Sequence, residues 1–182
     1  MTQILRVKGS EAFQADKNSM QSSFRIAAIG ELLWDLLPGG PQLGGAPANF
    51  AAMSANLSAG VSADEVFLVS RVGDDPQGAK ARDQLSAHNV SLDYISIDPK
   101  HATGSVTVTF DSKAGPAYRI EEEVAWDYIP ESPQLENLAP TLDALCFGTL
   151  AQRSPVTRKT LRSLVEATSP NCMRVFDVNL RA

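Results

Sequence analysis

Four short apolar segments constrain the fold of this 182-residue chain more than any other feature. Each has the length and the nearly continuous apolar character of a strand that is buried on both faces. Segments with helix start and stop signals separate them, so predicted strands and helices alternate. This alternation predicts βαβ units and an α/β fold with a mostly parallel, helix-covered central sheet. The predicted strands are 24–29, 65–69, 142–147 and 174–178.

The predicted helices between these strands begin at recognisable signals. Asp75 is expected to cap a helix over 76–88, whose first residue is a proline. Ser154 is expected to cap another helix in the same way, and a helix rich in small residues spans 48–59. Each of these helices is long enough to cover part of a sheet.

Polar residues directly follow several of the predicted strands. Right-handed crossovers bring the carboxyl ends of parallel strands to one edge of a sheet, and open α/β sheets bind their ligands at that edge. We therefore expect a binding site there. The polar residues at this edge are Asp35, Asp74, Asp75, Gln152, Asn179 and Arg181. Asp74 and Asp75 are interpreted as a turn residue and a helix cap.

The segment 43–50 contains two adjacent glycines immediately before a predicted helix. Gly44 and Gly45 leave the backbone bare, so a polar ligand can approach it closely. Pro47 suits the first turn of a helix, and the Asn49 amide one turn later offers one acceptor and two donors. This arrangement favours a site for a hydroxyl-rich molecule. Alone, it is also typical of a glycine-rich turn before a packing helix.

One insert interrupts the alternation of strands and helices. Residues 105–110 alternate strictly between apolar and polar side chains, a turn follows at 113–116, and 117–121 returns as a second strand. A two-stranded hairpin is marginal alone, so it requires another strand, a partner chain or both. The segment 34–42 is a candidate for further strands of this small sheet.

Composition excludes some classes of partner. The net charge of −5 and the lack of a basic run argue against nucleic acid, and no apolar stretch has the length of a membrane span. Residues 1–23 are interpreted as a flexible extension without a signal peptide, although Met20 is an alternative start. Cys146 and Cys172 are expected to be buried thiols, which favours a cytoplasmic location.

Several separated motifs together resemble the ribokinase-like carbohydrate kinases, also called the PfkB family, with the fructokinase-like members most similar. The resemblance covers about 24–181 and implies a partial sugar kinase domain over 24–182 with a three-layer fold. It also implies a small β lid within about 32–43 and 103–122 that often serves in dimerisation, so a homodimer is possible. The motifs are GELLWDLLP at 30–38, LGGAPANF at 43–50, VSRVGDDPQG at 69–78, TGS at 103–105, FGTLA at 147–151 and DVNLR at 177–181.

The resemblance implies a set of sugar-binding residues. Asp35 is the leading candidate, because an ionised carboxylate accepts hydrogen bonds from two adjacent hydroxyls; a solvated loop residue or a turn cap is the alternative. Gly44, Gly45 and Asn49 would form the second wall of the site. Arg119 would reach a hydroxyl or a phosphate oxygen, unless it pairs with a neighbouring glutamate. Gln152, which follows a predicted strand, is a weaker candidate that could contribute an amide, and the resemblance places Asn179 and Arg181 on the phosphate side.

The family's catalytic motif, Gly-Ala-Gly-Asp, does not occur in these 182 residues, and neither does a P-loop motif. In the resembling kinases this motif holds the phosphates and supplies the carboxylate base. ATP and Mg²⁺ are implied by the family, but the C-terminal half that binds them is missing from the chain. We therefore expect a sugar-binding portion with little activity of its own. A non-catalytic sugar sensor and a truncated product without function are the alternatives.

Overall fold

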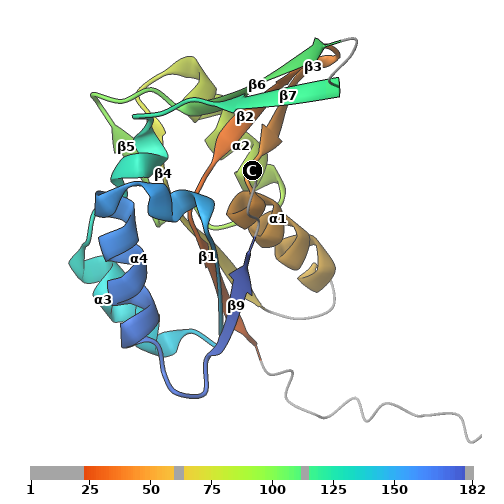
Figure 1. The fold of residues 1–182 in the computed structure, drawn as a ribbon. Coiled ribbons are helices and arrows are strands. Elements are labelled where there is room, and N and C mark those ends of the chain that lie inside the picture. The colour runs from red at the N-terminus through yellow and green to blue at the C-terminus, as the bar shows by residue number, and fades with distance from the viewer. Residues whose placement is uncertain (1–22, 60–63, 112–114, 179–182) are drawn as a thin grey trace, which may run out of the picture.

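A five-stranded parallel sheet forms the centre of the protein (Figure 1). The computed structural model describes residues 23–59, 64–111 and 115–178. The strand order is β5-β4-β1-β8-β9, and all four neighbouring pairs are parallel. The predicted α/β class and all four predicted strands are confirmed, and β5 is an additional strand. The bounds are β1 (Arg25–Ile29), β4 (Glu65–Gly73), β5 (Ile95–Asp98), β8 (Ala144–Gly148) and β9 (Met173–Asp177).

Helices cover both faces of this sheet and give the expected three layers (Figure 1). On one face, Ala28 and Leu68 pack in a core cluster with residues of α1 (Ala46–Ser58) and α2 (Pro76–Ala87). On the other face, Ala27, Ile29 and Val69 pack with residues of α3 (Pro133–Leu138) and α4 (Pro155–Ala167). Successive strand residues therefore point to opposite cores, which explains the continuous apolar runs in the sequence.

A second, four-stranded sheet lies at the carboxyl end of the parallel strands (Figure 1). It contains the predicted hairpin, β6 (Gly104–Asp111) and β7 (Gly115–Ile120), together with β2 (Leu33–Leu37) and β3 (Gly40–Gly44). The order is β3-β2-β6-β7, and β2 runs parallel to β6. We call this sheet the lid. The additional strands come from the predicted segment, and a homodimer through the lid stays a prediction.

Asp75 fastens the lid to the start of α2. Its side chain accepts from the Gly78 N–H at 2.7 Å, so the predicted helix cap is confirmed. It also accepts from the backbone N–H and the hydroxyl of Thr103, both at 2.8 Å, one residue before β6. Burial works to raise the pKa of Asp75, but these hydrogen bonds outweigh it and hold the pKa below its usual value.

A buried carboxylate at the end of β5 makes a second anchor for the segment that leads into the lid. Asp98 is 2% exposed and lies 3.2 Å from Arg71 Nη1. Its other contacts are the backbone N–H groups of Lys100 and His101 and the His101 ring at 2.9 Å. That ring stacks on Tyr128, with centroids 3.8 Å apart. His101, to which the sequence assigned no role, therefore stabilises the approach to the lid.

Other sequence-based expectations have mixed outcomes. Ser154 precedes α4 but makes no capping hydrogen bond; its hydroxyl donates instead to the Asp127 carbonyl, so that predicted cap is wrong. Cys146 and Cys172 are buried, free thiols, as expected. None of the helices in the described ranges has the length and apolarity to cross a membrane. The predicted extension lies outside the described residues except for residue 23.

Replacing Asp75 by alanine should lower the free energy of unfolding by about 2 kcal/mol at neutral pH, because a helix cap and the Thr103 contacts are lost. Asp74→Ala is the matched control, because that neighbouring side chain is exposed. Folding lowers the pKa of Asp75 from its usual value of 3.8. The stabilisation that Asp75 gives to the folded state is therefore complete above pH 3.8 and is lost as the pH falls through the lower pKa of the folded state. Urea denaturation at pH 7 and at pH 3 measures both effects, and equal losses in the two variants at pH 7 would contradict this role.

Candidate functional site

A cavity of about 520 Å³ lies between the carboxyl edge of the central sheet and the inner face of the lid. Its size falls within the range of about 300–1,000 Å³ that is typical of small-molecule sites. Its position matches the edge at which open α/β sheets bind ligands. The lining residues are Glu31, Leu33, Asp35, Gly45, Ala46, Asn49, Val106, Ile120, Gly148, Thr149, Leu150, Arg153 and Asp177.

The start of α1 is pressed against the end of β1. Gly45 has a φ of +105°, and a Cβ built on it would lie 2.3 Å from the carbonyl oxygen of Glu31. Only glycine fits such a contact. The Ala46 N–H donates to Glu31 Oε1 at 3.3 Å, and the helix has no side-chain cap of its own. Glu31 therefore caps α1 from a position fifteen residues earlier in the chain.

The Asp35 side chain lines the same cavity from the lid. It lies in β2, in which Leu33 is opposite Gly44 of the antiparallel strand β3. A Cβ built on Gly44 would lie 2.3 Å from Asp35 Oδ2, so the bare glycine leaves the room that the carboxylate occupies. The carboxylate and the diglycine thus converge beside one cavity, as the sequence predicted.

The lid also gives the cavity an apolar wall. Leu33, Val106 and Ile120 line it from the lid strands, and they pack together with Leu37 in a small apolar cluster. Asp35 lies on the same lid strand as Leu33, and the central sheet side contributes Glu31, Asp177 and the start of α1. An apolar surface facing a few convergent polar groups suits a monosaccharide, which has C–H faces and hydroxyl edges.

Arg153 is a lining residue that the sequence analysis missed. It follows β8 in the 3₁₀ helix η3 (Leu150–Arg153) and donates to both carboxylate oxygens of Asp127, at 2.8 and 2.7 Å. Its guanidinium also lies 4.0 Å from the ring centroid of the fully buried Trp126. Asp127 lies 26 residues earlier in the chain, so no local pattern indicates the pair. This bidentate contact fixes one corner of the cavity.

The acidic lining residues create a negative environment. Burial raises the pKa of Glu31, the hydrogen bonds from its own N–H and that of Ala46 oppose the shift, and the nearby charge of Asp177 adds to it. Below the cavity, burial raises the pKa of the Cys146 thiol to about 11, with further contributions from Asp177 and Glu31. Cys146 is therefore a protonated packing residue, because reactive cysteines require a lowered pKa.

The structure brings together some of the predicted site residues and separates others. Asp35, Gly45 and Asn49 line the cavity, and Gly44 lies directly beside the Asp35 carboxylate. The Gln152 amide does not line it; it donates to the Gly148 carbonyl at 2.8 Å. The Arg119 side chain is 82% exposed and lies 3.8 Å from Glu121. This position corresponds to the alternative expectation, in which Arg119 pairs with a neighbouring glutamate at the surface. Asn179 and Arg181 lie outside the described residues.

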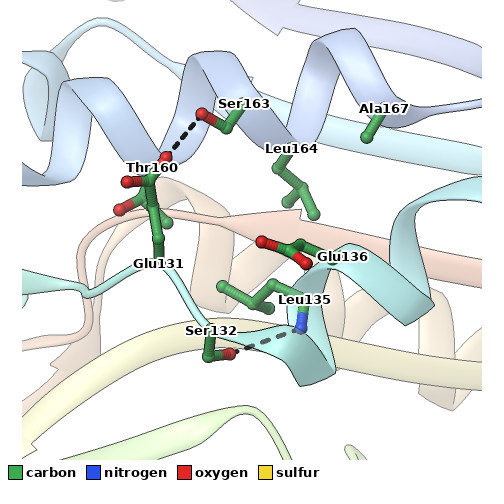
Figure 2. A pocket seen from close by; sticks show the side chains of 8 residues that line it. All are labelled: Glu131, Ser132, Leu135, Glu136, Thr160, Ser163, Leu164 and Ala167. Carbon is green, nitrogen blue, oxygen red and sulfur yellow. Dashed lines mark hydrogen bonds between the residues drawn. The ribbon is translucent and has the colours of Figure 1, made fainter.

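A smaller hollow lies between α3 and α4 (Figure 2). At about 40 Å³ it holds little more than a water molecule or two. The figure shows hydrogen bonds from the Leu135 N–H to the Ser132 hydroxyl and from the Ser163 hydroxyl to Glu131. These contacts cap α3 and join it to α4, so we interpret this hollow as a packing feature.

The family resemblance implies ATP and Mg²⁺, and the donor groups around the cavity decide whether the described residues could hold the metal. In the part of the chain that the structure describes, no group of three or more His, Cys, Asp and Glu side chains is placed to hold a metal ion. The carboxylates around the cavity are therefore too dispersed to chelate Mg²⁺ by themselves. The described residues therefore do not form a metal site by themselves.

Comparison with known proteins identifies the family. Residues 41–182 match the pfkB family carbohydrate kinases, so the chain belongs to this family. It is 30% identical over 167 residues to a sugar kinase of Pyrococcus horikoshii, covering 86% of this chain and 52% of that protein. It is 38% identical over 93 residues to a fructokinase of Klebsiella pneumoniae, covering 48% and 29% of the two chains.

Solved structures agree with this assignment. The sugar kinase of Pyrococcus horikoshii in complex with ATP has a TM-score of 0.72 and 31% identity, with 86% of this chain and 53% of that chain covered. A fructokinase of Vibrio cholerae has a TM-score of 0.68 and 25% identity, with 88% and 55% covered. The expected ribokinase-like fold is confirmed. The chain spans about half the length of the first of these relatives.

Replacing Gly45 by alanine should destabilise the protein more than replacing Gly40. Both glycines have positive φ, +105° and +113°, but only Gly45 has a backbone atom where the new Cβ would be. The strained backbone costs about 1–3 kcal/mol in either variant, and overpacking adds about 1–3 kcal/mol at Gly45 alone. Urea denaturation of the two variants measures the difference. Equal losses of stability would show that the contact between Gly45 and the Glu31 carbonyl oxygen can accommodate an added methyl group.

Proposed function

We propose that this chain is the sugar-binding portion of an ATP-dependent, fructokinase-like carbohydrate kinase, which transfers a phosphoryl group to a sugar hydroxyl. The main support is the convergence of Asp35 and the Gly45 backbone on one cavity of suitable size. The fructokinases among the relatives favour fructose as the acceptor. Membership in a family of carbohydrate kinases supports the general reaction.

Each polar group of the cavity has a role in this proposal. The Asp35 carboxylate accepts from two adjacent hydroxyls through charge-assisted hydrogen bonds. The bare backbone at Gly45 lets a hydroxyl approach the first turn of α1, and the Asn49 amide contributes further donors and an acceptor. Leu33 and Val106 pack against the C–H groups of the sugar. Binding by these groups fixes one hydroxyl in position, which is the main protein contribution to phosphoryl transfer.

ATP is proposed as the phosphoryl donor because related structures contain it, among them the sugar kinase of Pyrococcus horikoshii and a fructokinase of Xylella fastidiosa. Asn179 and Arg181 stay predictions for the phosphate side, since an arginine there would stabilise the charge of the transferred group. Mg²⁺ would neutralise the phosphate charges of bound ATP. A homodimer through the lid is a further proposal.

A non-catalytic sugar-binding module is the second candidate. It is favoured by the cavity between the lid and the central sheet, which the described residues line. Both candidates require sugar binding, and only the kinase requires transfer. A coupled assay for ADP release with fructose and ATP separates them.

Replacing Asp35 by asparagine should weaken fructose binding about 10–100-fold, because a charge-assisted hydrogen bond contributes about 1.5–3 kcal/mol. Isothermal titration calorimetry measures the change. Asp83→Asn is the matched control, because Asp83 is an exposed carboxylate on α2, outside the residues that line the cavity. If fructose binds the Asp35 variant and the parent chain equally, Asp35 is not part of the sugar site.

A further inference from the structure

The two ends of the lid hairpin, β6 and β7, are joined at one side of the cavity. The N–H of Glu121, the residue directly after β7, donates to the Ser105 carbonyl near the start of β6 at 3.0 Å. The next pair of residues across the hairpin, Val106 and Ile120, belongs to the apolar wall of the cavity. The point at which these ends are held therefore determines where that wall lies over the cavity.

Arg153 reaches the end of the hairpin from the side of the central sheet. Its Nη2 donates to the Glu121 carbonyl at 2.5 Å and to Asp127 Oδ2 at 2.7 Å, and its Nε donates to Asp127 Oδ1. One planar guanidinium thus joins the residue after β7 to the 3₁₀ helix η1 (Ala125–Tyr128). A lysine ammonium lacks this planar fork of donors and cannot reproduce the arrangement.

The Trp126 ring extends the same contact to the start of the hairpin. The ring is fully buried, and the Arg153 guanidinium lies over its face. A Cβ built on Gly104, the first residue of β6, would collide with Trp126 Nε1, so the ring lies directly against that strand. A cation over a desolvated indole face is strongly attracted to it. Arg153 therefore contacts one end of the hairpin directly and the other through Trp126.

The helix η1 is itself held by the central part of the protein. The Thr157 hydroxyl of α4 donates to the Trp126 carbonyl at 2.8 Å. Arg71 of β4 donates through Nη1 to the Tyr128 carbonyl at 2.7 Å. Donors from the central sheet and from a helix that covers it thus fix η1. Through Arg153 this fixed position is passed on to the lid hairpin.

We propose that Arg153 is a positioning residue for sugar binding, which fixes both ends of the lid hairpin and so places the apolar wall against the sugar. This inference rests on the proposed sugar-binding function and adds a residue that acts on affinity through the lid. Because the hairpin is held in the ligand-free protein too, a loss of affinity on replacing Arg153 must be accompanied by a looser hairpin end without ligand. A residue that only contacts the sugar would leave the ligand-free hairpin unchanged.

Arg153→Lys tests this role, because it keeps the positive charge and removes the planar fork and the ring contact. Arg158→Lys is the matched control. Arg158 donates through Nε to the Gln152 carbonyl at 2.6 Å and is not among the described residues that line the cavity. In calorimetry, Arg153→Lys should weaken fructose binding about 10-fold or more, a difference of about 1.4 kcal/mol, and Arg158→Lys less than about 2-fold.

Amide hydrogen exchange of the ligand-free variants, followed by NMR, separates positioning from direct contact and from general loss of stability. In Arg153→Lys the Glu121 amide should exchange at least about 5-fold faster than in the parent chain, because local opening at this end of the hairpin becomes easier. The increase should exceed that of the Ala28 and Cys146 amides, which lie in paired strands of the central sheet. Arg158→Lys should not change the exchange of Glu121 relative to these two amides.

Asp127→Asn replaces Arg153→Lys if circular dichroism shows that the lysine variant does not fold. Asp127 is not among the described lining residues, so it acts on the cavity through Arg153, and both changes are expected in the same direction. If neither variant folds, the pair is required for folding itself and the positioning role is overturned.

The remaining outcomes distinguish the inference from the function on which it rests. Unchanged fructose affinity in the folded variant overturns the inference while sugar binding stands. Weaker binding with unchanged Glu121 exchange would show that Arg153 contacts the sugar directly, and equal acceleration of all three amides would show a general loss of stability; either result also overturns it. If the parent chain does not bind fructose, the proposed function itself fails, and the inference fails with it.

Discussion

The contact between Gly45 and the Glu31 carbonyl is the constraint on which the site depends. It presses the start of α1 against the end of β1, and a side chain at position 45 would force them apart. The contact also places the Glu31 carboxyl group where it caps the helix through the Ala46 N–H. One bare backbone position therefore fixes the helix, its cap and the floor of the cavity together.

The lid completes the site from the other side, and its attachment follows similar physics. Asp75 and Asp98 are carboxylates that accept hydrogen bonds from the segment that leads into β6, and Gly78 and Arg71 supply further contacts. Hydrogen bonds to the charged form keep the pKa of both groups low despite burial. The strand β2 then carries Asp35 over Gly44, where the absent side chain leaves space for it. The two sheets are thus held close together by glycines, the half-buried Asp75 and the buried Asp98.

The sequence predicted those features that depend on short-range patterns. The apolar runs of β1, β4, β8 and β9 indicate strands because both faces of a parallel sheet are buried, and Asp75 before Pro76 indicates a capped helix. The lid strands followed from strict alternation in β6 and from family resemblance. Asp35 and Gly45, which line the cavity, were predicted as site residues because both occur in motifs that lie at the carboxyl edge.

The features that the sequence analysis missed depend on partners distant in the chain. Arg153 pairs with Asp127, and Glu31 caps a helix that begins fifteen residues later. Gln152 was placed in the site because it follows a strand, but its amide is satisfied locally by the Gly148 carbonyl. Ser154 has the expected residue type for a cap, yet its hydroxyl bonds to the Asp127 carbonyl instead. In each case contacts within the folded chain outcompete the role that the local pattern suggests.

The central claim is that the start of α1 and the Asp35 carboxylate form a single monosaccharide site. The most direct measurement is a titration of the ¹⁵N-labelled chain with fructose, followed by amide chemical shifts. We expect the largest changes at Gly45, Ala46, Asn49 and Gly148, which line the cavity. Saturating shifts confined to the hollow between α3 and α4, or an unperturbed spectrum at high fructose concentration, would contradict it.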